Sequence, residues 1–214
     1  MFARTPATAV DPLSPARLAI DLVRRYRLQR GSRLLVVDSR PGELVSCLRA
    51  HGLTAFGLYD GPAPPRDPYA KAASDDNAPS IQPAVLHQSL PFVAQSFDGV
   101  LLQDSDVYRG LLTGPEACTA TANLLASLKP GKPLVYTGSI ATAVFRAHLN
   151  AFPGTSCEIA LCSSGIGGLL RKLLGRGGEQ TAVQFTLPGE AISRLEWHRL
   201  ARQAVIGFQR QPAA

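Results

Sequence analysis

The sequence contains little of the cysteine that small secreted proteins use to cross-link their folds. Only four cysteines occur in 214 residues, and they are too few and too scattered for a disulfide framework. No stretch approaches the roughly 18 consecutive apolar residues that a membrane-spanning helix needs. The first residues also lack the apolar segment of a secretory signal. These absences lead us to expect a cytoplasmic protein with reduced thiols.

Lysine is also scarce, because arginine supplies 18 of the 22 basic residues. The chain carries a formal net charge of +6, but the excess is unevenly distributed. Residues 1–33 have a net charge of +5, residues 34–140 have −3, and residues 141–214 have +4. The basic flanks therefore indicate either contact with an anionic partner, RNA or an acidic protein, or simply solvated helix faces.

The remaining composition is typical of a globular protein. Hydrophobic residues make up 45% of the chain, and a chain of this length buries a sizeable core without cross-links. We expect a basic helical lead-in over residues 1–33 and one domain over residues 34–214, within a single-domain protein.

Short apolar runs alternate with helical segments along the chain. The runs 34–38 and 55–60 both end in an aspartate, and they fit strands that are buried on both faces. Further strands are expected at 84–87, 99–103, 133–137, 157–162 and 181–187. Helices are expected at 15–30, 43–51, 115–128, 142–152 and 191–203. This order predicts an α/β fold, a doubly wound Rossmann-like seven-stranded mixed sheet with helices on both faces.

Four segments, in order, resemble motifs of the class I S-adenosylmethionine-dependent methyltransferases. They are residues 36–42 at the first motif, 56–60 at the second strand, 90–101 around the fourth strand and 128–135 before the fifth. The resemblance covers roughly half of the chain. It implies S-adenosyl-L-methionine as cofactor and transfer of a methyl group to a small-molecule or other acceptor.

The resemblance also implies which residues contact the cofactor. Those near the first two strands are Asp38, Ser39, Arg40, Gly42 and Asp60. Asp60 lies 22 residues after Asp38, close to the offset at which an acid meets a ribose in dinucleotide-binding folds. Such an acid accepts hydrogen bonds from both ribose hydroxyls, whereas the structural alternative is an aspartate that caps a turn.

A second group of predicted cofactor residues follows the third expected strand. His87, Gln88 and Ser89 lie where the family contacts adenine. The family often has an acid there, and this sequence has none among the three.

The first motif departs from the family pattern, acid-x-Gly-x-Gly-x-Gly. Arg40 and Leu44 occupy the first and third glycine positions, so that only Gly42 remains. Arg40 either points away, contacts the carboxylate of the cofactor's methionine part, or blocks the pocket. This degeneracy supports an alternative function, a catalytically degenerate methyltransferase fold that acts as a binding or scaffold module.

The predicted catalytic residues, Asp104 and Tyr108, follow the run 99–103. At the end of a parallel strand, these side chains are suited to orient a nucleophile or accept its proton; an ordinary acidic surface loop is the alternative. Residues 103–106 lack the [DN]PP[YFW] motif, which argues against methylation of amino groups on bases or glutamine. No metal site is predicted, because Cys157 and Cys162 have an odd spacing that directs them to opposite faces of a strand.

Overall fold

The computed structural model describes residues 15–38, 41–60, 81–103, 105–109, 112–137, 142–152, 156–161, 181–186 and 192–210. Its strands are β1 (Arg33–Val37), β2 (Thr54–Asp60), β3 (Ile81–Ala84), β4 (Gly99–Leu102), β5 (Pro133–Tyr136), β6 (Ser156–Leu161) and β7 (Thr181–Thr186). Its helices are α1 (Pro15–Arg25), α2 (Gly42–Ala50), α3 (Asp106–Arg109), α4 (Pro115–Ser127), α5 (Thr142–Asn150) and α7 (Arg194–Arg210).

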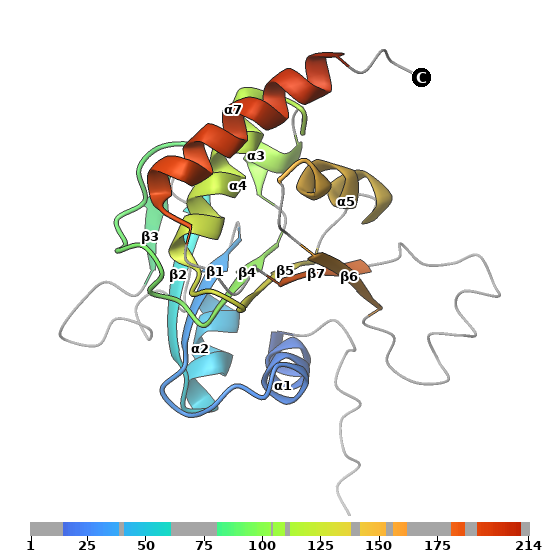
Figure 1. Cartoon of the computed structure of the whole chain (residues 1–214). Coiled ribbons are helices and arrows are strands. Elements are labelled where there is room, and N and C mark those ends of the chain that lie inside the picture. The colour runs from blue at the N-terminus through green and yellow to red at the C-terminus, as the bar shows by residue number, and fades with distance from the viewer. Residues whose placement is uncertain are drawn as a thin grey trace, which may run out of the picture.

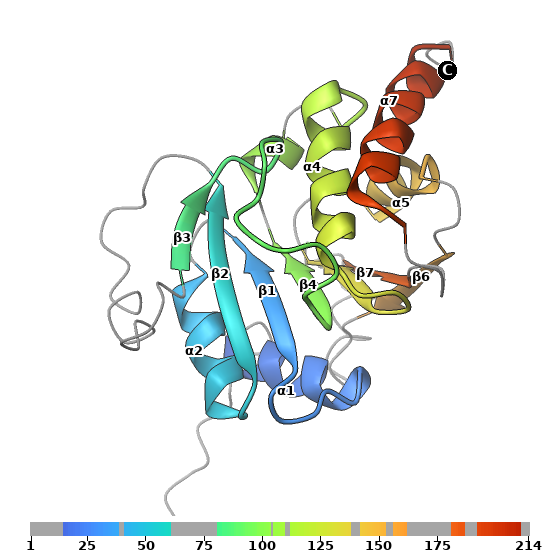
Figure 2. The ribbon, with the colours of Figure 1, turned by 60° about the vertical axis from the view of Figure 1, so that its left-hand side comes forward.

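The strands form one sheet in the order β3-β2-β1-β4-β5-β7-β6 (Figures 1 and 2). The five strands from β1 to β5 pair in parallel, whereas β7 runs antiparallel to both β5 and β6. The chain therefore moves outward from β1 to β3 and then returns to the other side of β1 at β4. This arrangement confirms the predicted doubly wound α/β class and creates a switch point between β1 and β4.

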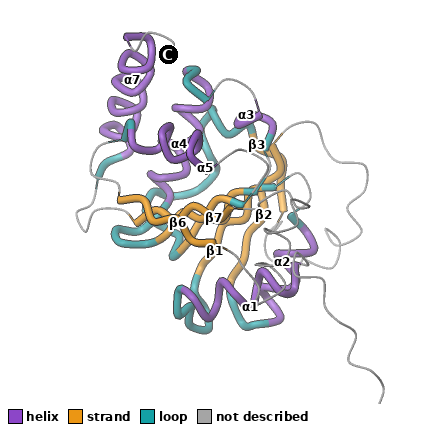
Figure 3. The backbone as a smooth tube through the Cα atoms, turned by 90° about the vertical axis from the view of Figure 1, so that its right-hand side faces the viewer, coloured by secondary structure: helices purple, strands orange, loops and turns teal. Residues whose placement is uncertain are grey.

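Helices cover both faces of the sheet. Viewed along the layers, α1 and α2 lie on one side of the sheet, and α4, α5 and α7 lie on the other (Figure 3). Each interface has its own hydrophobic cluster. Leu34 and Val36 of β1 face α1 and α2, whereas Leu35 and Val37 face the larger cluster, because successive side chains of a strand point to opposite faces.

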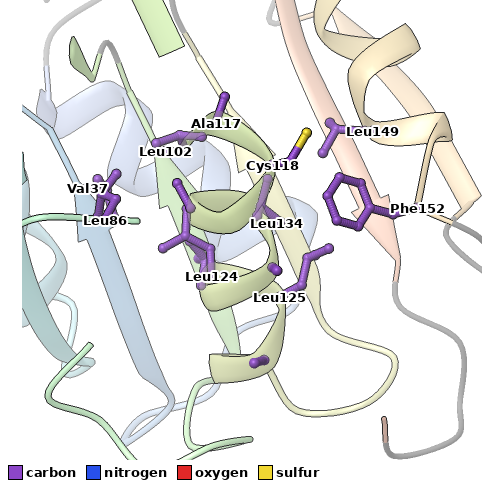
Figure 4. Close-up of a cluster of buried hydrophobic side chains, with 14 of the residues drawn as sticks. Val37, Leu86, Leu102, Ala117, Cys118, Leu124, Leu125, Leu134, Leu149 and Phe152 are labelled. Carbon is purple, nitrogen blue, oxygen red and sulfur yellow. The ribbon is translucent and has the colours of Figure 1, made fainter. Parts of the chain in front are cut away.

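Helix α4 is the most deeply buried helix among the described residues. Ten of its 13 residues are buried, and it packs between the sheet and α7. Figure 4 shows its leucines among side chains from several other elements. This burial extends well beyond the single apolar stripe of an ordinary surface helix.

Asp98 stabilises the amino edge of the sheet, where the parallel strands β1 and β4 begin. Its carboxylate accepts hydrogen bonds from the Arg33 backbone N–H at 3.0 Å and from Lys129 Nζ at 2.8 Å. Burial raises the pKa of Asp98, but the hydrogen bonds from Lys129 and Arg33 outweigh it and hold the pKa below its usual value. Two of the family-like segments are thus joined by one ion pair, far from the carboxyl edge.

The structure corrects several of the expected elements, and α1 ends at Arg25 rather than at residue 30. The third strand is Ile81–Ala84 rather than 84–87, and residues 85–88 form a turn that is closed by a hydrogen bond from Gln88 N–H to Val85 O at 2.8 Å. Asp106–Arg109 forms the short helix α3 instead of continuing a loop. Helix α7 begins and ends later than expected, at Arg194–Arg210.

The basic lead-in packs on the domain through one face of α1. Ala19 and Leu22 are buried in the cluster beneath α2, whereas Arg24 and Arg25 are exposed. Arg24 and Arg25 therefore lie on a solvated face of this helix. In the part of the chain that the structure describes, none of the helices is long and apolar enough to span a bilayer.

Candidate functional site

Polar residues meet at the carboxyl edge of the parallel strands, on both sides of the switch point. Asp38 directly follows β1, Gln103 follows β4 and Thr137 follows β5. Their backbone N–H groups donate to Leu58 O at 3.1 Å, Val37 O at 2.8 Å and Leu102 O at 2.8 Å, respectively. These bonds continue the sheet by one residue, so Asp38, Gln103 and Thr137 lie side by side.

Thr137 also presents a polar atom that the described residues leave without a partner. The residue is 7% exposed, and its Oγ1 is buried with no hydrogen bond from any described residue. A buried hydroxyl without a partner is unfavourable by about 1–3 kcal/mol. At the carboxyl edge, this hydroxyl is suited to form a hydrogen bond with a ligand.

The turn of the first motif is packed onto β2 through Pro41. The residue precedes Gly42, the first residue of α2, and is itself the N-cap of this helix. A Cβ on Gly57 would lie only 3.0 Å from Pro41 Cγ and 3.0 Å from Ile81 Cγ1. The absence of a side chain at Gly57 therefore allows the proline ring to approach the sheet and fixes where α2 begins.

Leu44 does not fill the space above the strands. It is 2% exposed and belongs to the cluster between α2 and the sheet. The leucine at the third glycine position of the degenerate motif thus forms part of the hydrophobic core. Leu44 therefore does not obstruct a ligand at this edge. Arg40, the other residue in place of a motif glycine, lies outside the described residues.

The loop after β3 carries His87, Gln88 and Ser89. Gln88 and Ser89 are exposed and His87 is half-buried. His87 Nδ1 is itself buried and has no hydrogen-bond partner among the described residues. Asn123 of α4 holds the loop from below through the carbonyl groups of Leu86 and Gln88.

The other predicted cofactor residues are placed in part. Asp60 is the last residue of β2 and pairs with Ala84 of β3, so its main chain lies at the same edge as Asp38. Ser39 lies outside the described residues, as does Asp104. The structure thus brings the main chains of Asp38, Gly42 and Asp60 to one edge.

Tyr108 lies on α3 but not on an open surface. It is 1% exposed, and its hydroxyl is 2.9 Å from Thr121 Oγ1, which in turn is 2.8 Å from His148 Nε2. Burial lowers the pKa of His148 to about 4, against a small opposing effect of the Leu112 backbone. This buried chain joins α3, α4 and α5, and the position of Tyr108 does not support its predicted catalytic role.

Three residues at this edge, Gln103, Asn123 and Thr137, are not identified by the sequence argument. Asn123 could have been found from its place in an otherwise apolar helix, since an asparagine disfavours a helix interior and needs partners when buried. Thr137 carries no comparable signal, because a threonine after a strand is an ordinary turn residue.

No protein-family model matches this sequence, and neither does any curated protein. Solved structures do resemble it. An S-adenosylmethionine-dependent methyltransferase from Mesorhizobium loti has a TM-score of 0.56 at 14% identity, over 81% of this chain and 98% of that one. The N-methyltransferase NodS from Bradyrhizobium japonicum has a TM-score of 0.52 at 17% identity, over 81% and 97%.

A third resemblance is to a chain from Haloferax volcanii that was solved in complex with the methyltransferase activator Trm112. It has a TM-score of 0.58 at 14% identity, over 80% of this chain and 89% of that one. Identities this low carry no information about individual site residues, but the shared architecture is extensive. The chain therefore has the fold of the class I S-adenosylmethionine-dependent methyltransferases.

Proposed function

We propose that this chain is a cytoplasmic methyltransferase that uses S-adenosyl-L-methionine to methylate a small-molecule acceptor. The observation that carries the proposal is that the main chains of Asp38, Asp60, Gln103 and Thr137 lie along one carboxyl edge, on both sides of the switch point of a methyltransferase fold. In open α/β sheets, ligands bind at the carboxyl ends of the strands where the strand order reverses.

Features of the described residues fit an adenosyl cofactor at this edge. The N-terminus of α2 lies at this edge, and the amide dipoles of a helix N-terminus favour an anion such as the carboxylate of the methionine part. Thr137 Oγ1 and His87 Nδ1 are buried polar atoms without partners in the described part of the chain. Leu44 leaves the edge free because it packs beneath α2.

Each predicted residue then has a role in holding the cofactor. Asp60 accepts hydrogen bonds from the ribose hydroxyls, and the loop with His87, Gln88 and Ser89 surrounds the adenine. Asp38, Ser39, Arg40 and Gly42, the residues of the first motif, would contact the methionine part. The cofactor supplies an electrophilic methyl group, so the protein's main task is to align the acceptor with it.

On the acceptor side, Asp104 remains the proposed catalytic residue, because it follows β4 directly beyond Gln103. Its carboxylate would orient the acceptor or take its proton. Tyr108 has a different task in this proposal. Through Thr121 it anchors α3 and so positions the segment that carries Asp104.

Calorimetric titration with S-adenosylhomocysteine tests the proposal against the scaffold alternative. A micromolar dissociation constant is the expected result, and an absence of binding at millimolar ligand would contradict the enzyme. Incubation with methyl-labelled cofactor and pooled small metabolites then reports whether label is transferred to an acceptor.

Replacement of Asp60 by alanine is expected to weaken binding of S-adenosylhomocysteine about 10- to 100-fold, because hydrogen bonds to a charged group contribute about 1.5–3 kcal/mol. Asp60→Asn, which keeps an acceptor oxygen without the charge, should lose less. Glu43→Gln, an exposed carboxylate in the first turn of α2, is the matched control. Unchanged affinity in Asp60→Ala would remove the ribose role from this residue.

A further inference from the structure

Asn123 is a polar residue in the interior of the otherwise apolar helix α4. It is 3% exposed, and its side chain points out of the helix to another segment of the chain. Its Nδ2 donates to Leu86 O at 2.8 Å and to Gln88 O at 2.6 Å. Both hydrogens of one amide are therefore used to hold two carbonyl groups of the same loop.

The loop that receives these bonds is short and anchored from one side. The turn 85–88 is closed by Gln88 N–H and Val85 O, and the Leu86 side chain is fully buried in the core. Asn123 satisfies the carbonyl groups on the same side. Gln88 and Ser89 are exposed to solvent, and His87 is half-buried.

The chemistry of the asparagine side chain suits this task. A primary amide offers two donors on one nitrogen at the end of a short side chain. Serine or threonine in its place offers a single donor, and aspartate would set its own oxygens against the two carbonyl groups. Because both bonds end on the main chain, they fix the course of the loop whatever side chains the loop carries.

We propose that Asn123 is a positioning residue that holds the loop 86–89 in the conformation that recognises adenine. The proposal rests on the proposed function, since adenine is the ligand group assigned to this loop. In this arrangement the loop discriminates adenine from other purines because its hydrogen-bonding groups are fixed before the ligand arrives.

The test compares two ligands that differ only in the purine. Wild-type protein, Asn123→Ala and Asn123→Ser are titrated with S-adenosylhomocysteine and with S-inosylhomocysteine, in which oxygen replaces the 6-amino group. The expected result is that Asn123→Ala binds the adenosyl ligand about tenfold more weakly and loses most of the wild-type preference for it. Asn123→Ser, with one donor, should lie between the two.

Leu125→Ala is the matched control on the same helix. Leu125 is fully buried, and Figure 4 shows it on the side of α4 near Phe152, away from Leu86. Its removal destabilises the fold through a cavity without touching the loop. A purely structural effect lowers affinity for both ligands equally, so an unchanged preference in both Asn123 variants would overturn the proposal.

Hydrogen exchange of the Gln88 amide separates failure of this inference from failure of the proposed function. If wild-type protein binds neither ligand, the methyltransferase proposal fails, and the adenine role falls with it. Faster exchange at Gln88 in Asn123→Ala, but not in Leu125→Ala, would still establish the positioning of the loop. Unchanged exchange at Gln88 together with an unchanged ligand preference would contradict both the positioning of the loop by Asn123 and its effect on adenine recognition.

Discussion

Acidification from pH 7 to pH 4 is expected to lower the free energy of unfolding by about 3 kcal/mol through His148 alone. This side chain is 2% exposed and lies among aromatic rings, with its plane stacked on Phe208 at 6.2 Å between ring centroids. Phe145 of α5 and Phe152, which follows that helix, are further ring neighbours of His148. An imidazolium in this environment loses its hydration without gaining an ionic partner from the rings that enclose it.

The direction of the effect follows from the two pKa values. In the folded protein the pKa of His148 is lowered from 6.5 to about 4. Between these values the unfolded chain binds a proton that the folded chain does not, so stability falls as the pH falls. At pH 7 both states are neutral at this residue, and the contribution is fully present.

Urea denaturation at several pH values between 7 and 4 measures this dependence. His148→Gln keeps a hydrogen-bonding group near Thr121 but does not titrate, so its unfolding free energy should lose most of the slope in this range. Leu149→Ala provides the control, because it destabilises the same helix at a fully buried residue that does not titrate and should therefore retain the wild-type slope. An equal slope in wild type and His148→Gln would show that other groups govern acid sensitivity.

Replacement of Gly57 by alanine is expected to cost about 2–3 kcal/mol and to displace the turn that begins α2. The new methyl group would lie within 3.0 Å of Pro41 Cγ and Ile81 Cγ1. A proline ring cannot rotate away, because it is part of the main chain. Relief therefore requires movement of the first motif itself, and cofactor affinity should fall together with stability.

Gly99→Ala is the informative comparison, since its Cβ would approach Leu34 Cδ2 even more closely, at 2.8 Å. That atom is the end of a flexible side chain, and it borders a small apolar cavity lined in part by Leu22 and Tyr26. Leu34 can rotate, so a loss below about 1 kcal/mol is expected. Equal losses in thermal or urea unfolding for both variants would refute this distinction.

A second-site change can confirm the cause of the Gly57 effect. Pro41→Gly removes the ring that blocks the new methyl group, so the double variant should recover part of the cofactor affinity that Gly57→Ala loses. Additive losses in the two single variants and the double variant would contradict direct contact between these residues.

Several elements are predictable from the sequence because their local pattern and their burial agree. The run 34–38 is apolar enough to be a central parallel strand, and Pro115 at the start of an apolar segment indicates a helix start. Asp98 and Lys129 contribute to the family resemblance for a structural reason, because their ion pair fixes the amino edge of the sheet. Their recognition therefore predicted the fold rather than the chemistry.

Other segments take a conformation that tertiary contacts decide. Residues 84–87 have the apolar character of a strand, but a turn forms at 85–88 because α4 supplies Asn123 to its carbonyl groups. Tyr108 has a plausible sequence position for catalysis, yet Thr121 and His148 draw its hydroxyl into the core. Both outcomes depend on residues that are distant in sequence, Asn123, Thr121 and His148, so local pattern could not predict either of them.

The position of α4 between the sheet and α7 has a consequence for synthesis of the protein. Translation proceeds at about 5–20 residues per second, so α4 leaves the ribosome seconds before Arg194–Arg210, which covers its outer side. Strand β5 likewise lacks its antiparallel neighbour until β7 has been synthesised. During that interval the nascent chain exposes the apolar surface of α4, and exposed apolar surface of this kind is prone to aggregation.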